Sequence, residues 1–236
     1  MQPPDQLAAK TNKEPPQTHS NKPIRGKEDH RMPHSPDSTV HHSILTKLRA
    51  LVPHRHLSIE EALRIAELQA THLLALQHID EAPVPSEVIT ELPKLRVEYA
   101  NTPVSGACFW DGHDWVIELN PRQTHTRRRF ILAHEYKHII DHGLAGFLYP
   151  PQICSHGLDH AEYAADYFAG CLLVPKTQLK RAFAHGIQSL HDLARHFDVT
   201  ERAIATRLKQ TGLSDPTPRC MGRHHQQHNS AERNLI

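Results

Sequence analysis

Two histidines and a glutamate with the spacing of a metal site occur at His134, Glu135 and His138. On a helix, residues four apart share a face, so both imidazoles can reach one Zn²⁺ ion at about 2.0–2.1 Å. Glu135 lies to the side of that face, where its carboxylate can accept a proton from a water molecule that zinc has made more acidic. The same carboxyl group can then protonate the departing amine. The HExxH spacing therefore predicts hydrolysis of a peptide bond.

The surroundings of this motif favour a buried metal site over a chance match in a chain with 22 His. Apolar residues precede the motif at 130–133 and follow it at 139–140. Two buried imidazoles and a buried carboxylate without partners would cost free energy, and one shared metal ion removes that cost.

A third protein ligand is needed to complete such a site. Glu162 is favoured because it begins the next helical segment, where small residues at 164, 165, 169 and 170 allow close approach. Asp166, one turn further on, could hold a ligand histidine through its second nitrogen. His142 lies about 12 Å along the helix from His134, which suits a packing role. Glu162 has one competing interpretation, as the partner of Asp159 in a capping box. The other candidates are Asp141, His156, His160 and Asp166.

Strand patterns precede the motif helix. Residues 95–99, 107–110 and 115–119 read as strands, and Asp111-Gly112-His113-Asp114 between the last two has the composition of a hairpin turn. The motif helix is expected from about Thr126 to Asp141, with Gly143 after its end. A second helix is expected over 159–173, and an earlier one of about twenty residues begins at the capping box Ser58-x-x-Glu61.

The C-terminal part of the chain reads as short helices, with Ser189 and Thr200 as N-caps and Gly212 as a C-cap. The expected fold is α+β and zincin-like. A small twisted β-sheet with a hairpin packs on the HExxH helix and on a second ligand helix, and a C-terminal helix-turn-helix-like element follows. We expect a Pro/His-rich tail over 1–43, a zinc metallopeptidase-like domain over 44–180, the helical element over 181–213 and a polar tail over 214–236.

Charge and composition restrict the partners. Lys and Arg (27) nearly cancel Asp and Glu (26), so strong general attraction to nucleic acid or to an anionic membrane is not expected. No apolar run has the roughly 18 residues of a transmembrane helix. Cys108, Cys154, Cys171 and Cys220 show no paired spacing, which is typical of reduced thiols. These features favour a cytoplasmic protein, whose oligomeric state they leave open.

Two linked segments resemble the ImmA/IrrE family of zinc metallopeptidases. The first is Arg129-Phe-Ile-Leu-Ala-His-Glu-Tyr-Lys-His138, and the second is Glu162-Tyr-Ala-Ala-Asp-Tyr-Phe-Ala-Gly-Cys-Leu-Leu-Val-Pro175. The resemblance extends from about residue 99 to 213. It implies a gluzincin-like fold with His134, His138 and Glu162 on zinc and Glu135 as the general base. It also implies an enzyme that cleaves a helix-turn-helix repressor in mobile-element or stress-response control.

The chain departs from the family pattern at three positions. Tyr136-Lys137 stands where Leu-Gly is common, which is expected to place a bulky, charged pair next to the metal. Ala164 and Asp166 replace the family's second Glu and its Asn, and change the surroundings of the ligands. Three residues remain candidates for stabilising the oxyanion: Tyr149, His160 and Tyr163.

Two other functions fit the residues. One is a DNA-binding transcriptional regulator, whose last helix would present Arg202, Arg207 and Lys209. The other is a non-catalytic zinc-binding partner protein, against which the intact Glu135 argues. Arg127-Arg128-Arg129 is expected to be a solvated helix start that pairs with nearby acids.

Overall fold

The computed structural model describes residues 43–150 and 157–213. Both predicted tails, apart from Ser43, lie outside the described residues, as do Cys154, His156 and Cys220. The described helices are α1 (Ile44–Arg49), α2 (Ile59–Leu76), α3 (Glu87–Thr90), α4 (His125–Asp141), α5 (Ala145–Leu148), α6 (Gly157–Leu173), α7 (Lys176–Ala184), α8 (Leu190–Phe197) and α9 (Glu201–Thr211). The strands are β1 (Leu95–Tyr99), β2 (Gly106–Trp110) and β3 (Trp115–Leu119).

The strands form one sheet in the order β1-β3-β2. β2 and β3 are the predicted antiparallel hairpin, with Trp110 opposite Trp115. Its turn is held by the Asp111 carboxylate, which accepts hydrogen bonds of 2.8 Å from the backbone N–H groups of His113 and Asp114. β1 pairs with β3 in parallel, so the chain crosses over between 99 and 115, which the sequence pattern did not predict. This order leaves β2 as an edge strand.

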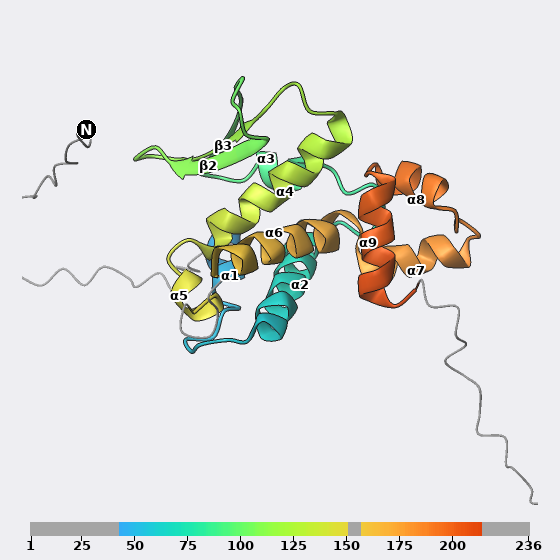
Figure 1. Ribbon diagram of the computed structural model, residues 1–236, viewed down its shortest axis with the longest axis horizontal. Helices are drawn as coiled ribbons and strands as arrows, with labels where there is room; N and C mark the ends of the chain where they lie inside the picture. The colour runs from blue at the N-terminus through green and yellow to red at the C-terminus, as the bar shows by residue number, and fades with distance from the viewer. Residues whose placement is uncertain (1–42, 151–156, 214–236) are drawn as a thin grey trace, which may run out of the picture. The chain divides into compact units, whose positions relative to one another are not determined.

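The two helices that carry the candidate ligands are stacked beneath the sheet. In Figure 1 the sheet lies on one side of α4, α6 lies on the other, and α2 lies beyond α6. Small buried residues of α6 allow this close packing: Ala164, Ala165 and Ala169 are fully buried. The main apolar core joins α2, α4, α6 and the inner face of the sheet, with Leu73, Ile117, Ile140 and Phe168 among its members.

The caps expected from the sequence set the ends of these helices. Ser58 and Glu61 form the reciprocal capping box of α2, and the Thr124 hydroxyl caps the first turn of α4. Gly143, with φ of +80°, follows the end of α4. α6 begins at Gly157, two residues before the predicted start. Asp159 therefore lies inside the helix and not at the N-cap position.

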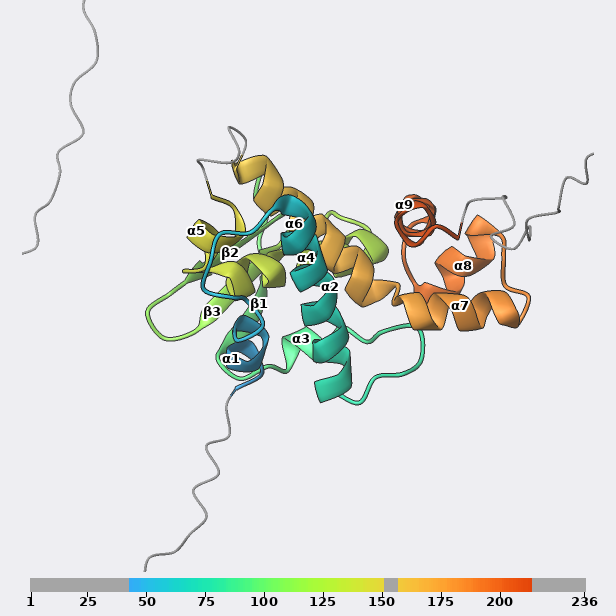
Figure 2. The same cartoon turned by 90° about the horizontal axis from the view of Figure 1, so that it is seen from below.

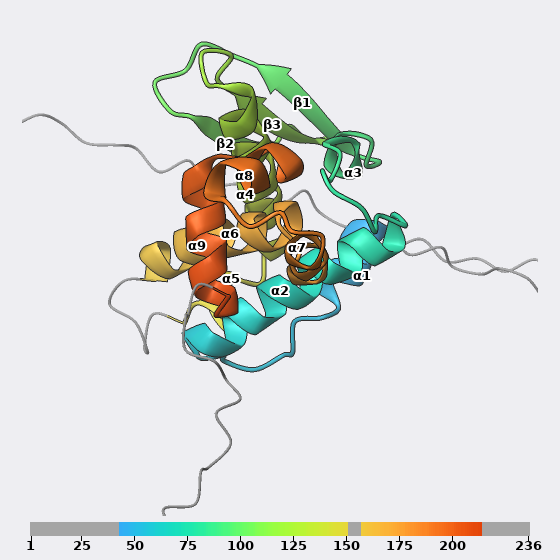
Figure 3. The ribbon, with the colours of Figure 1, turned by 90° about the vertical axis from the view of Figure 1, so that its right-hand side faces the viewer.

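The C-terminal helices α7, α8 and α9 form a group of their own in Figure 2 and in Figure 3 and share an apolar cluster. Leu179, Leu193, Phe197 and Ile204 are fully buried there, and Phe130 of α4 packs against the same cluster. The predicted α+β class is confirmed. None of the described helices combines the length and the apolar character that crossing a membrane requires.

Candidate metal centre

Three potential ligand side chains converge between α4 and α6. The Nε2 atoms of His134 and His138 lie 3.1 Å apart. Glu162 places its two carboxylate oxygens 3.2 Å from His134 Nε2 and 3.3 Å from His138 Nε2. The three residues singled out from the sequence as metal ligands thus form one cluster. Their role as zinc ligands stays a prediction.

The dimensions of this triangle suit a tetrahedral ion. Ligand atoms about 2.0–2.1 Å from a metal at tetrahedral angles lie about 3.3–3.4 Å from one another. The separation of the two histidine nitrogens, 3.1 Å, is close to that edge length, and each nitrogen lies 3.2 to 3.3 Å from a different oxygen of the Glu162 carboxylate. Two imidazole nitrogens and one carboxylate also form the donor set of catalytic zinc sites, which keep a fourth position open.

Asp166 fixes the orientation of the first histidine. Its carboxylate lies 2.9 Å from His134 Nδ1, so Nδ1 carries the hydrogen and Nε2 keeps its lone pair facing the cluster. Burial lowers the pKa of His134, but the hydrogen bond and charge of Asp166, with the charges of Glu135 and Glu162, outweigh it and raise that pKa. For His138, burial and the neighbouring His134 lower the pKa. The two imidazoles therefore differ in basicity within one site.

Glu135 faces the same cavity without joining the triangle. The cavity is lined by His134, Glu135 and Glu162 together with Ser105 and Gly106 at the start of β2. A Cβ atom at Gly106 would lie 3.3 Å from Glu135 Oε1 and only 2.3 Å from a methyl carbon of Ile131. A residue without a side chain is therefore required where β2 crosses α4. The edge strand and the carboxylate meet at this point.

Cys108 is a neighbour of Glu135 that the sequence patterns did not indicate. Burial raises the pKa of the Cys108 thiol to about 12, and the charge of Glu135 and a hydrogen bond to it contribute. The thiol is thus a neutral donor beside the carboxylate. Only its position two residues after Gly106 on β2, which puts both residues on one face of the strand, could have suggested this contact.

The structure locates several of the other candidates for the third ligand, whereas His156 lies outside the described residues. Because α6 starts before Asp159, the capping-box interpretation of Glu162 is wrong. His142 is exposed beyond the end of α4, where its ring packs 4.9 Å from Trp115, in line with the expected packing role. Asp141 is buried in the core, and Asp166 forms a hydrogen bond with Nδ1 of His134, on the side of the ring away from the cluster.

The expectation that Tyr136 and Lys137 crowd the metal is wrong. Both side chains are buried on other faces of α4 and line no part of the metal cavity. Lys137 is fully buried with its Nζ 2.5 Å from Asp141 Oδ1, and the Tyr149 hydroxyl donates to the other oxygen of Asp141 at 2.7 Å. Burial lowers the pKa of Lys137 and raises that of Tyr149. Tyr149 is therefore engaged in the core and is not available as an oxyanion donor.

Two buried arginines attach the C-terminal helices to α4 and α6. Arg129 donates to the backbone oxygens of Val84, Phe197 and Asp198, and its guanidinium lies 2.8 Å from the Asp198 carboxylate. It is buried, so the expectation of a solvated start is wrong for this arginine. Arg207 is buried as well and donates to Val174 and Glu67. Arg207, one of the three cations that a DNA-reading helix would present, thus makes its contacts within the protein.

These features define a class of protein in which a helix with an HExxH motif faces a second helix that carries a glutamate, under the edge of a small sheet. A family model described as IrrE N-terminal-like domain, peptidase M78, matches residues 93–209. This part of the chain belongs to the ImmA/IrrE family, as the two motifs indicated. The match includes both helices of the candidate metal centre and extends through most of α9. Membership supports a metallopeptidase-like or regulatory role.

A solved structure described as a Mycobacterium tuberculosis transcriptional regulator has a similar fold. The TM-score is 0.53 and the identity 15%, over 69% of this chain and 50% of the other. At this identity the likeness concerns the fold alone, and the chain spans about half the length of that regulator. No curated protein matches the chain in sequence.

Proposed function

We propose that this chain is a zinc-dependent endopeptidase that cleaves a regulatory protein, of the helix-turn-helix repressor class, in mobile-element or stress-response control. The observation that carries the proposal is the convergence of His134, His138 and Glu162 beside a separate carboxylate, Glu135. A purely structural zinc site has no use for a general base at its edge. Membership of the family supports the same activity.

The donor set fits zinc, and the three side chains of the triangle would hold it. A bound zinc ion would polarise the peptide carbonyl and make a water molecule more acidic. Glu135 accepts the proton from the attacking water and transfers it to the amine that leaves. Asp166 keeps the His134 ring in place, because its carboxylate holds the Nδ1 hydrogen throughout.

The edge of β2 supports binding of the substrate as an extended strand. β2 has one neighbour, β3, and its outer edge begins at Gly106 beside Glu135. A peptide that pairs with this edge would run past the triangle, and its backbone hydrogen bonds would carry no sequence preference. Selectivity must then come from side-chain pockets and from a second contact surface. We propose that helices α8 and α9 contribute that surface.

The test uses two kinds of substrate. The zinc-loaded protein is incubated with helix-turn-helix regulators encoded near its gene and, separately, with denatured casein. One discrete cut in a regulator, with little casein digestion, is the expected result, since a positioned extended segment is cleaved more readily than arbitrary sequence. Efficient casein digestion with no cut in any regulator would contradict the proposed specificity.

A further inference from the structure

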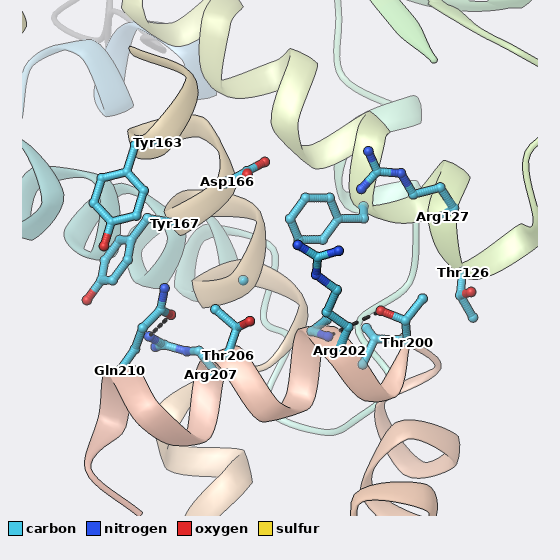
Figure 4. Close-up of a pocket in the computed structure, with 14 residues that line it drawn as sticks. Thr126, Arg127, Tyr163, Asp166, Tyr167, Thr200, Arg202, Thr206, Arg207 and Gln210 are labelled. Atoms are coloured by element: carbon cyan, nitrogen blue, oxygen red, sulfur yellow. Dashed lines mark hydrogen bonds between the residues drawn. The ribbon is translucent and has the colours of Figure 1, made fainter. Parts of the chain in front are cut away.

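A cavity of about 450 Å³ lies next to the metal centre, between α4, α6 and α9. Its walls include Arg127 and Phe130 from α4, Tyr163 and Asp166 from α6, and Arg202 from α9 (Figure 4). A cavity of this size is in the range that binds small ligands or side chains.

This cavity adjoins the metal cavity. Arg127, Phe130 and Asp166 line both of them, so the two share a wall made by α4 and α6. Asp166 accepts from the ligand His134 on one side and borders the larger cavity on the other. A polypeptide held over the triangle can therefore place a neighbouring side chain in the larger cavity.

The arginines give the cavity a positive net charge, although the Asp166 carboxylate also lines it. Arg127 and Arg202 are both exposed and extend into it from opposite walls, α4 and α9 (Figure 4). Over residues 43–150 and 157–213, no carboxylate lies within ion-pair distance of either guanidinium. The third arginine at this cavity, Arg207, is buried and already donates to Val174 and Glu67. The acid at the cavity, Asp166, is engaged by His134.

The position of one arginine is supported by an aromatic ring. The guanidinium carbon of Arg127 lies 5.6 Å from the centre of the Phe130 ring, which is a cation–π arrangement. The N–H groups of the guanidinium that extend past the ring can still donate hydrogen bonds to a ligand. Gly170 also lines the cavity, and a Cβ atom there would be in ordinary van der Waals contact with Arg207 and Gln210 at 3.9 Å. The cavity thus combines aromatic rings with two guanidinium groups that have no ion-pair partner in the described part of the chain.

We propose that this cavity is a specificity subsite that accepts an acidic side chain of the substrate, one or two residues from the bond that is cut. Arg127 and Arg202 bind the carboxylate, because a guanidinium offers paired N–H donors that match its two oxygens. The proposal rests on the proposed peptidase function, which makes a polypeptide the occupant. It also gives α9 a defined part in selecting the substrate.

The experiment measures peptide selection without turnover. The Glu135→Gln protein, loaded with zinc, is equilibrated with a mixture of random hexapeptides, and the retained peptides are sequenced by mass spectrometry. We expect Asp and Glu to be enriched about three- to tenfold over Asn and Gln, which is the range for two partly exposed ion pairs. Adding Arg127→Gln and Arg202→Gln should abolish that enrichment.

The matched control removes two positive charges from the C-terminal helices that lie away from the cavity. Arg195 of α8 and Lys209 of α9 are exposed and do not line the cavity, so Arg195→Gln with Lys209→Gln should keep the enrichment. Thermal unfolding of both double variants confirms that each is folded. Equal loss in both, retention in both, no acidic enrichment or no retained peptide at all would each overturn the subsite. Failure of the proposed function would appear separately, as absence of cleavage of every regulator by the unsubstituted enzyme.

Discussion

At the scale of single residues, the site separates metal binding from proton transfer. His134, His138 and Glu162 point at one another, whereas Glu135 points toward the edge strand. We therefore expect Glu135→Gln to bind zinc as the unsubstituted protein does and to lose cleavage by about 10²- to 10⁴-fold, since the amide cannot accept the proton. Zinc content and regulator cleavage are measured on the same preparation. Undiminished cleavage would remove Glu135 from the mechanism.

The ligand assignment is tested by two variants outside the HExxH motif, one on α6 and one just after α4. Glu162→Ala removes one corner of the triangle and should weaken zinc binding by more than about 100-fold, beyond the usual loss for a supporting residue. His142→Ala removes only a ring that packs on Trp115, so zinc binding should hardly change. Titration with a chromophoric zinc chelator compares the two. Equal weakening in both, or weakening only in the His142 variant, would reverse the assignment.

The sequence predicted that the two histidines lie together because the spacing that brings them together is local. The i, i+4 spacing of His134 and His138 places both rings on one helical face whatever surrounds the helix. Glu162 was favoured among six candidates because small residues on the next helix allow close approach and because the family resemblance implied it. By contrast, the burial of Arg129 depends on Asp198, which is distant in sequence, and Lys137 is buried with Asp141 where Tyr149 of the following segment also donates to that carboxylate. No local pattern reveals a partner such as Asp198, and both residues were expected to be near solvent or the metal.

At the scale of elements, turn and cap residues predicted most helix and strand ends, and tertiary pairing was missed. Ser58, Thr200 and Gly212 cap helices as expected. The parallel pairing of β1 with β3 was not predicted, because it joins segments with a whole strand between them. That pairing leaves β2 at the edge beside Glu135. The crossover, which the sequence did not predict, thus determines which strand lies at the edge, and we propose that this strand binds the substrate.

The buried pair on α4 gives a prediction at this scale. Asp141→Asn leaves Lys137 without its counter-charge in the core and should lower the free energy of unfolding by about 3–5 kcal/mol. The double variant Lys137→Met with Asp141→Asn should recover most of that loss, because no unpaired charge remains. Chemical denaturation measures all three proteins. If the single and double variants are equally unstable, charge burial is not the cause.

At the scale of the whole molecule, a metal ion would join parts of the chain that are otherwise held by packing. The triangle takes two ligands from α4 and one from α6, so an ion bound there links the helix under the sheet to the helix that carries α7, α8 and α9. Because the unfolded chain does not hold these three groups together, binding should favour the folded state. The stabilisation then depends on zinc concentration by mass action.

A concentration of free zinc 100 times its dissociation constant should stabilise the fold by about 2.7 kcal/mol. For a folded region of this size, that corresponds to a rise in Tm of about 5–10 °C. Thermal unfolding is followed with buffered zinc and with a chelator. Glu135→Gln should show the same rise, since the proton acceptor is not a ligand, and Glu162→Ala should show little. A rise that survives in Glu162→Ala would place the bound zinc elsewhere on a chain with 22 His, and the triangle would then not be the metal centre.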